Sequence, residues 1–66
     1  MELTVNGAPT LLPDGTTVAE LVAQRTTEQR RVAVARNGEV VPRSTWGATA
    51  LADGDAVEVL MAVAGG

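Results

Sequence analysis

The two glycines at the end of the sequence, Gly65 and Gly66, are the residues with the clearest potential for chemistry. Because glycine has no Cβ, such a backbone can pass through a narrow channel and approach a bound nucleotide closely. A free α-carboxylate has a pKa of about 3.5, so it is ionised at neutral pH and is a poor acyl donor. Activation as an acyl-adenylate would make the Gly66 carbonyl electrophilic, and a sulfur nucleophile could then displace AMP. The alternative interpretation is a frayed chain end without a role.

Catalysis by side chains has few candidates in this chain. The sequence has no His, Cys, Lys, Tyr or Phe. It therefore lacks the usual general base at neutral pH, a thiolate nucleophile and a Schiff-base amine. The one serine, Ser44, has no histidine to activate it, and carboxylates alone are a poor ligand set for zinc. We therefore expect a carrier or binding module rather than an enzyme, with no catalytic residue, bound cofactor or metal of its own.

Length and composition limit the chain to one small domain. It has 66 residues, 45% of them hydrophobic, which is enough for one core and leaves no room for a second. The formal net charge of −3 is opposite in sign to what nucleic acids attract. The first residues do not resemble a signal peptide, and the longest apolar run, 59–64, is far shorter than a membrane span. We expect a cytoplasmic protein with no nucleic-acid or membrane partner.

Two Asn-Gly pairs predict two β-hairpins. A type I′ turn needs positive φ at both central residues, which asparagine and glycine adopt most easily. Asn6-Gly7 and Asn37-Gly38 each lie between short segments with the pattern or composition of strands. Pro42 should end the second hairpin because it cannot donate a hydrogen bond to a sheet. The expected strands cover residues 2–5, 8–12, 32–35 and 39–41, and a fifth covers 56–63.

One helix is expected between the two hairpins. Thr17 and Glu20 match a capping box, in which each side chain bonds to the backbone N–H of the other residue. The residues expected on one face of this helix are Val18, Leu21, Val22 and Arg25.

The segment between Pro42 and the last strand is expected to be largely irregular, with a short helical turn around residues 44–46. Trp46, the only aromatic residue, should anchor this loop to the core. Asp53, Gly54 and Asp55 should form a turn rather than a metal site.

The predicted order is β-β-α-β-β-β, and a single helix can cover only one face of a sheet. This predicts an α+β fold with a mixed five-stranded sheet and one main helix packed on one face. Hairpins joined by a helix indicate that the first and last strands are neighbours, which is the β-grasp (ubiquitin-like) arrangement. We expect residues 1–63 to form the domain and residues 64–66 to form a flexible C-terminal tail.

The last strand should present different side chains to its two faces. One face carries Val57, Val59, Met61 and Val63, which we expect to point toward the core. The other carries Glu58, Leu60 and Ala62. Exposed apolar residues next to the tail would form a docking surface, so Leu60 and Ala62 are candidate partner contacts. The alternative is an ordinary solvated face.

The chain resembles the ubiquitin-like sulfur carriers, and within them the ThiS family of thiamine biosynthesis, over essentially its whole length. The most specific part is Val41-Pro42-Arg43 followed by Trp46, placed before an Asp-Gly-Asp turn and a terminal Gly-Gly. This part favours the thiamine branch over the molybdopterin branch. The matching segments are 5–7, 15–21, 34–43, 46, 51, 53–55, 57–59 and 64–66.

The resemblance implies a reaction cycle carried out by partners. An E1-like (ThiF-like) adenylating enzyme would use ATP and Mg²⁺ to adenylate Gly66, with Ala64 and Gly65 threading into its active site. A persulfide, such as that of a cysteine desulfurase, would convert the adenylate into a thiocarboxylate. A ThiG-like thiazole synthase would then take the sulfur. Arg43, in the matching Val-Pro-Arg stretch, becomes a further candidate partner contact, although a solvated arginine is the simpler interpretation.

Three alternatives remain open from the sequence. The same carrier chemistry could serve another pathway, as the small subunit of molybdopterin synthase or in cysteine synthesis. The chain could instead be a ubiquitin-like modifier, joined to lysines of other proteins by isopeptide bonds. It could also be a plain interaction module with an inert tail, in which case removal of Gly65 and Gly66 would have no effect.

Overall fold

The two Asn-Gly turns form the two hairpins that the sequence predicts. The computed structural model describes residues 1–27 and 31–61 of the chain. Asn6 and Asn37 have φ angles of 53° and 52°, and the glycines after them have 81° and 85°, so φ is positive at both central positions of each turn. The strands of the hairpins are β1 (Glu2–Val5) and β2 (Ala8–Leu11), then β3 (Val32–Arg36) and β4 (Glu39–Val41).

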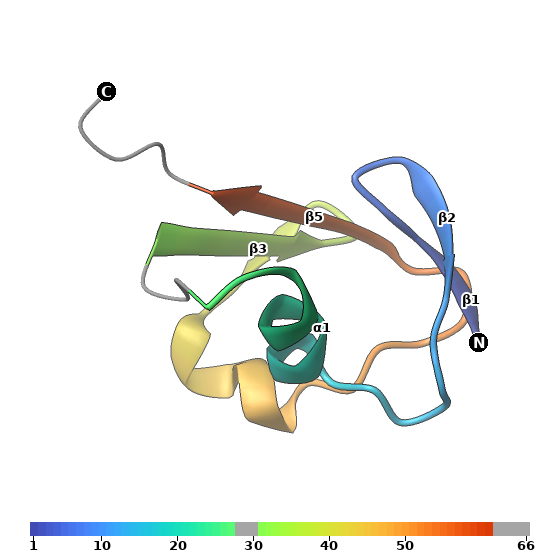
Figure 1. Ribbon diagram of the computed structural model, residues 1–66, viewed down its shortest axis with the longest axis horizontal. Coiled ribbons are helices and arrows are strands. Elements are labelled where there is room, and N and C mark those ends of the chain that lie inside the picture. Colours follow the sequence, from blue (N-terminus) through green and yellow to red (C-terminus); the bar gives the residue numbers. More distant parts are fainter. Residues whose placement is uncertain (28–30, 62–66) are drawn as a thin grey trace.

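A fifth strand, β5 (Ala56–Met61), lies between the hairpins and joins them into one sheet. The strand order is β2-β1-β5-β3-β4. β5 runs parallel to β1 and antiparallel to β3, beside which it lies in Figure 1. The prediction of a mixed five-stranded sheet with adjacent first and last strands is confirmed.

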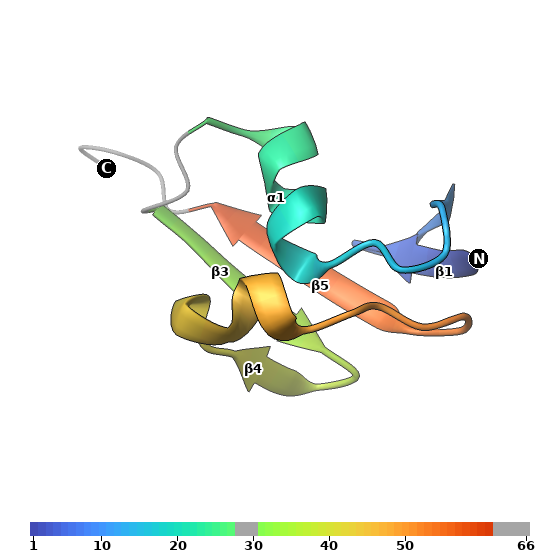
Figure 2. The ribbon, with the colours of Figure 1, turned by 90° about the horizontal axis from the view of Figure 1, so that it is seen from below.

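The helix α1 (Val18–Arg25) begins at the predicted capping box. The Thr17 hydroxyl accepts a hydrogen bond from the Glu20 N–H at 3.2 Å, and the Glu20 carboxylate accepts one from the Thr17 N–H at 3.0 Å. A 3₁₀ helix, η2 (Arg43–Ala48), packs beside α1 on the same side of the sheet (Figure 2). The opposite face of the sheet, which we call the open face, has no helix of the described chain over it.

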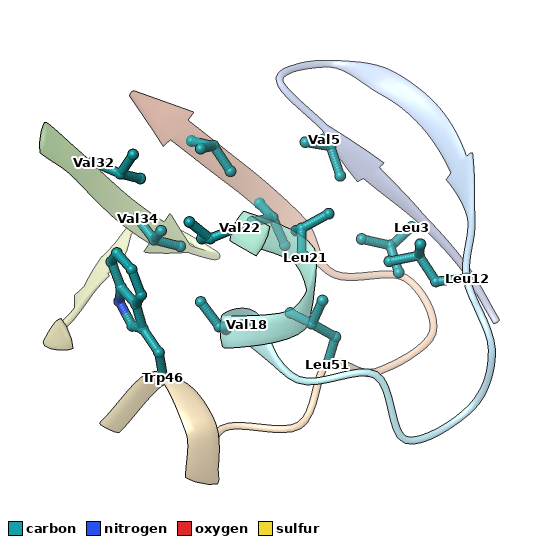
Figure 3. Packing of buried hydrophobic residues seen from close by; sticks show 12 residues of the cluster. Leu3, Val5, Leu12, Val18, Leu21, Val22, Val32, Val34, Trp46 and Leu51 are labelled. Carbon is teal, nitrogen blue, oxygen red and sulfur yellow. The ribbon is translucent and has the colours of Figure 1, made fainter. Parts of the chain in front are cut away.

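The hydrophobic core lies between the sheet and the two helices (Figure 3). Alternate residues of β1, β3 and β5 point into it, and α1 contributes three residues of its predicted face, while the fourth, Arg25, is exposed. Trp46 fills the space beneath η2 and is only 3% exposed, as expected of an anchor for this loop. The core residues are Leu3, Val5, Leu12, Val18, Leu21, Val22, Val32, Val34, Trp46, Leu51, Val57 and Val59.

Several element boundaries differ slightly from the prediction. β2 ends at Leu11, one residue early, and β3 continues to Arg36. The helical turn expected around 44–46 is the longer η2. Residues 62 and 63 of the expected last strand, and the boundary between domain and tail, lie outside the described residues.

The prediction that Met61 faces the core is wrong. Its side chain is 51% exposed, although Val57 and Val59 on the same side of β5 are buried. The register of the sheet gives the reason. β1 pairs with β5 only at Ala56 and Val57, so at Met61 only β3 lies alongside the strand.

Val59 and Leu60 are neighbours in β5 that face opposite sides of the sheet, with exposed fractions of 5% and 61%. Val59→Asp would bury an unpaired carboxylate and should lower the free energy of unfolding by about 3 kcal/mol or more. Leu60→Asp would place the same carboxylate in water and should leave stability within about 0.5 kcal/mol of wild type. Urea unfolding followed by circular dichroism measures both. Equal stabilities of the two variants would contradict these face assignments.

Candidate functional site

The predicted reactive tail, residues 64–66, follows β5 after two further residues. Gly66, Gly65, Ala64 and Ala62 lie outside the described residues, so the roles assigned to them remain predictions. The structure shows instead how the strand that leads to them is held. β5 ends at Met61, and its arrow in Figure 1 points away from the N-terminal side of the molecule.

On the side of β1, the strand β5 is held first by main chain and then by a side chain. The Thr4 N–H donates to the Asp55 carbonyl at 3.0 Å, and the Asn6 N–H donates to the Val57 carbonyl at 2.8 Å. The chain then turns into β2, and the Asn6 side chain continues the pairing. Its Oδ1 accepts from the Val59 N–H at 2.8 Å, and its Nδ2 donates to the Val59 carbonyl at 3.2 Å.

A second turn asparagine holds the other end of β5. The Asn37 N–H donates to the Ala56 carbonyl at 2.8 Å, and Asn37 Oδ1 accepts from the Ala56 N–H at 2.9 Å. Its Nδ2 donates to the Asp55 carboxylate at 3.0 Å. Each Asn-Gly pair therefore closes a hairpin and also fixes one end of the central strand.

The carboxylate of Asp55 is the centre of a buried polar cluster at the start of β5. It is 2.8 Å from Arg36 Nε and accepts a hydrogen bond from the Ala52 N–H at 2.8 Å. Burial raises the pKa of Asp55, but the hydrogen bonds from Ala52 and Asn37 and the charge of Arg36 lower it by more than burial raises it. The pKa of Asp55 therefore lies below the ordinary value of 3.8. Asp55 is thus an ionised structural group within the predicted turn.

The open face carries exposed apolar side chains near the end of β5. Leu60 lies opposite Ala33 of β3, and Val40 of β4 lies opposite Ala35. We call Ala33, Ala35, Val40 and Leu60 the open-face patch; Val40 is 76% exposed. Glu58, also exposed, lies opposite Ala35 and adds a negative charge beside the patch. Such a surface is suited to contact with a partner whose surface is apolar and bears a cation.

Arg43 lies away from the open-face patch. It belongs to η2, and its guanidinium carbon is 5.7 Å from the centre of the Trp46 ring, within the range of a cation–π interaction. Trp46 in turn donates its Nε1–H to the Val41 carbonyl at 2.9 Å. Because η2 is part of the helical layer and Leu60 faces the other side, the structure does not bring these two predicted partner contacts together (Figure 2).

Residues 1–27 and 31–61 contain neither a cluster of metal ligands nor a membrane-spanning helix. Within these ranges, no group of three or more His, Cys, Asp or Glu residues could hold a metal ion. No helix of the same ranges is long and apolar enough to cross a membrane. Ser44, the one serine, lies exposed in η2.

Sequence comparisons relate the whole chain to proteins of thiamine biosynthesis. A model of the ThiS family matches residues 1–66. The sulfur carrier protein ThiS of Escherichia coli is 33% identical over 66 residues, which is 100% of both chains. The thiazole synthases of Paramagnetospirillum magneticum and Magnetococcus marinus are 36% and 38% identical over 66 residues, and the chain spans 20% of the length of each.

Solved structures show the same relation. The crystal structure of the thiamine biosynthesis protein ThiS from Geobacter metallireducens matches with a TM-score of 0.82 and 42% identity over 100% of both chains. The solution structure of a thiamine biosynthesis protein from the same organism matches with a TM-score of 0.81. The molecule is therefore a small β-grasp domain of the ubiquitin-like class. More narrowly, the chain belongs to the ThiS family.

Two features near the tail were missed by sequence reasoning. Val40 belongs to the open-face patch, but the strand of residues 39–41 is too short to show which of its side chains is exposed. Asn6 was recognised as a turn residue only. Its contact with Val59 joins residues 53 positions apart in the sequence, and no local sequence pattern predicts such a contact.

The lowered pKa of Asp55 predicts how stability depends on pH. Because its folded pKa lies below the unfolded value, Asp55 stabilises the fold above about pH 4, and this contribution is lost as the pH falls through the folded value. Asp55→Asn should therefore cost about 1–3 kcal/mol at pH 7, and the difference from wild type should shrink toward pH 3. Urea unfolding at several pH values measures this. A difference independent of pH would refute it, and Asp14→Asn at the 94%-exposed carboxylate of Asp14 is the control.

Proposed function

We propose that this chain is a sulfur carrier of thiamine biosynthesis and that Gly66 carries the sulfur. The observation that carries the proposal is the match of the whole chain, through residue 66, to the ThiS family. The full-length relative from Escherichia coli is named a sulfur carrier protein. The composition agrees, because a chain without His, Cys or Lys offers its terminal carboxylate as the reactive group. In this role the chain is a co-substrate of other enzymes rather than an enzyme.

The first step of the proposed cycle is adenylation by an E1-like partner. The Gly66 carboxylate attacks the α-phosphate of ATP, pyrophosphate leaves, and the product is a mixed anhydride of Gly66 and AMP. ATP and Mg²⁺ are bound by the partner, and Mg²⁺ there neutralises charge on the phosphates. Ala64 has a small side chain and Gly65 has none, so that the backbone can reach the nucleotide in a narrow site.

The second step replaces oxygen by sulfur. The terminal sulfur of a partner persulfide, such as that of a cysteine desulfurase, attacks the Gly66 carbonyl and AMP leaves, giving an acyl disulfide. A second thiol then attacks the sulfur on the partner's side of this acyl disulfide. The products are the Gly66 thiocarboxylate and a disulfide between the two thiols, so the thiol is the reductant.

The proposed acceptor of the sulfur is a thiazole synthase. Two relatives of that name contain a segment similar to this chain over 20% of their length. A carrier and its acceptor in one polypeptide would meet at a high effective concentration, which fits a pair of proteins that act on each other. This observation favours thiamine biosynthesis over the other pathways that a sulfur carrier could serve.

The intact mass of the protein tests the proposal. After incubation with the adenylating enzyme of the same genome, ATP, Mg²⁺, a persulfide donor and a thiol, we expect a mass gain equal to the exchange of one oxygen for sulfur, localised to Gly66. Deletion of Gly66, or Gly65→Leu, should abolish the gain without unfolding the domain, because core residues among those described end at Val59.

Gly47→Ala is the matched glycine control for the mass experiment. A Cβ at Gly47 would meet nothing within 4 Å, so this variant should load like wild type. An unchanged mass of the wild-type protein with an active partner would refute the sulfur-carrier proposal. Isopeptide conjugates in place of the thiocarboxylate would instead support a protein modifier.

The open-face patch is the proposed docking surface for the adenylating enzyme, with Leu60 and Ala62 as contacts and Arg43 as a separate one. Leu60→Asp should weaken binding by about tenfold or more, because hydrophobic anchors at interfaces contribute about 1–2 kcal/mol or more. Leu11 is the control: it is 77% exposed on the open face but belongs to the edge strand β2. Isothermal titration calorimetry measures both dissociation constants, and equal losses for Leu60→Asp and Leu11→Asp would contradict a patch centred on Leu60.

A further inference from the structure

We infer that Asn6 is a positioning residue for the reactive tail, because its side chain fixes β5 at Val59, two residues before Met61, the last described residue of the strand. The inference rests on the proposed function, since it assumes that residues after Met61 must be presented to a partner. It adds to that function a residue that neither reacts nor belongs to the open-face patch.

The contacts on the two sides of β5 show why Val59 is the critical point. On one side, the β3 register continues from Val59 opposite Val34 as far as Met61 opposite Val32. On the other side, the pairing with β1 ends at Val57, and the Asn6 side chain alone extends it to Val59. Among the described residues, Val59 is therefore the last residue of β5 with a neighbour on both sides: Val34 of β3 lies opposite it, and the Asn6 amide bonds to its N–H and C=O.

The chemistry of the contact is specific to asparagine. Its amide offers one acceptor and one donor, and both go to the same residue, with Oδ1 accepting from the Val59 N–H and Nδ2 donating to the Val59 carbonyl. The side chain thus takes the place of the main-chain acceptor and donor that a longer β1 would offer to Val59. Aspartate could accept but not donate, and glycine could do neither. At φ 53° the position also favours Asn, Asp or Gly.

The contact matters for transfer because β5 carries both parts of the proposed interaction. Leu60 of the open-face patch lies one residue beyond Val59, and the predicted tail, residues 64–66, begins four residues beyond Leu60. A strand held on both sides at Val59 fixes the direction in which β5 runs from the docked patch toward the tail. If β5 were held by β3 alone at this point, the end of the strand could point in a wider range of directions. A smaller fraction of docked complexes would then have the carboxylate in place.

The experiment compares Asn6→Gly with Asn37→Gly. Both variants become Gly-Gly turns, which accept positive φ. Each also loses two side-chain hydrogen bonds: Asn6→Gly loses both bonds to Val59, and Asn37→Gly loses one to Ala56 and one to Asp55, the residue before β5. They differ in which end of β5 is released. Steady-state adenylation kinetics with the partner enzyme should show kcat reduced about fivefold to tenfold for Asn6→Gly with KM within about twofold of wild type. Asn37→Gly should keep both constants within about twofold.

A second readout does not depend on the partner. Amide hydrogen exchange should accelerate at Val59, whose N–H loses its acceptor, and at the next residue, Leu60, in Asn6→Gly but not in Asn37→Gly. Asn6→Asp, which keeps the acceptor, should lie between wild type and Asn6→Gly. Equal exchange at these amides in the two glycine variants, or equal kcat values, would overturn the inference while the wild type still gains sulfur. If the wild type gains no sulfur, the proposed function fails and the kinetic role of Asn6 falls with it.

Discussion

An interior strand of a sheet needs partners for its N–H and C=O groups along both edges, and β5 finds them in two hairpins that are far apart in the sequence. β3 supplies one edge along the whole strand, while β1 and then the Asn6 amide supply the other. Neither hairpin has a sheet to join until β5 is in place. The alternation of β5 also fixes the two layers, because Val57 and Val59 point into the core while Glu58 and Leu60 point to the open face.

The two ends of β5 are fixed by polar contacts and its middle by burial. At the start, the ionised carboxylate of Asp55 contacts Ala52, Asn37 and Arg36. A buried carboxylate is tolerated here because each of its oxygens has a partner. Toward the other end, the neutral amide of Asn6 holds Val59 by two hydrogen bonds and adds no charge there. This distribution places the charge pair of Arg36 and Asp55 at the end of β5 that is farther in the sequence from the proposed chemistry.

The elements that the sequence predicted correctly are those whose causes are local. Positive φ at Asn-Gly, the reciprocal bonds of Thr17 and Glu20, and the apolar face of α1 all act within a few residues. The adjacent position of β1 and β5 followed from topology. Two kinds of feature could not be found this way. The exposure of Met61 depends on where β1 stops, and the contact of Asn6 with Val59 depends on the register between distant strands.

A tail that ends in two glycines has almost no side chains with which to contact a partner, so its position relative to a partner has to be set by the folded domain. Among the described residues the core ends at Val59, and the exposed Leu60 and Met61 follow it. Stability and chemistry are therefore separated along β5. The group that Gly66 is proposed to carry would be attached several residues beyond Val57 and Val59 in the sequence. Conversely, the direction of β5 as it leaves the core is set by contacts, such as that of Asn6, that belong to the fold rather than to the tail.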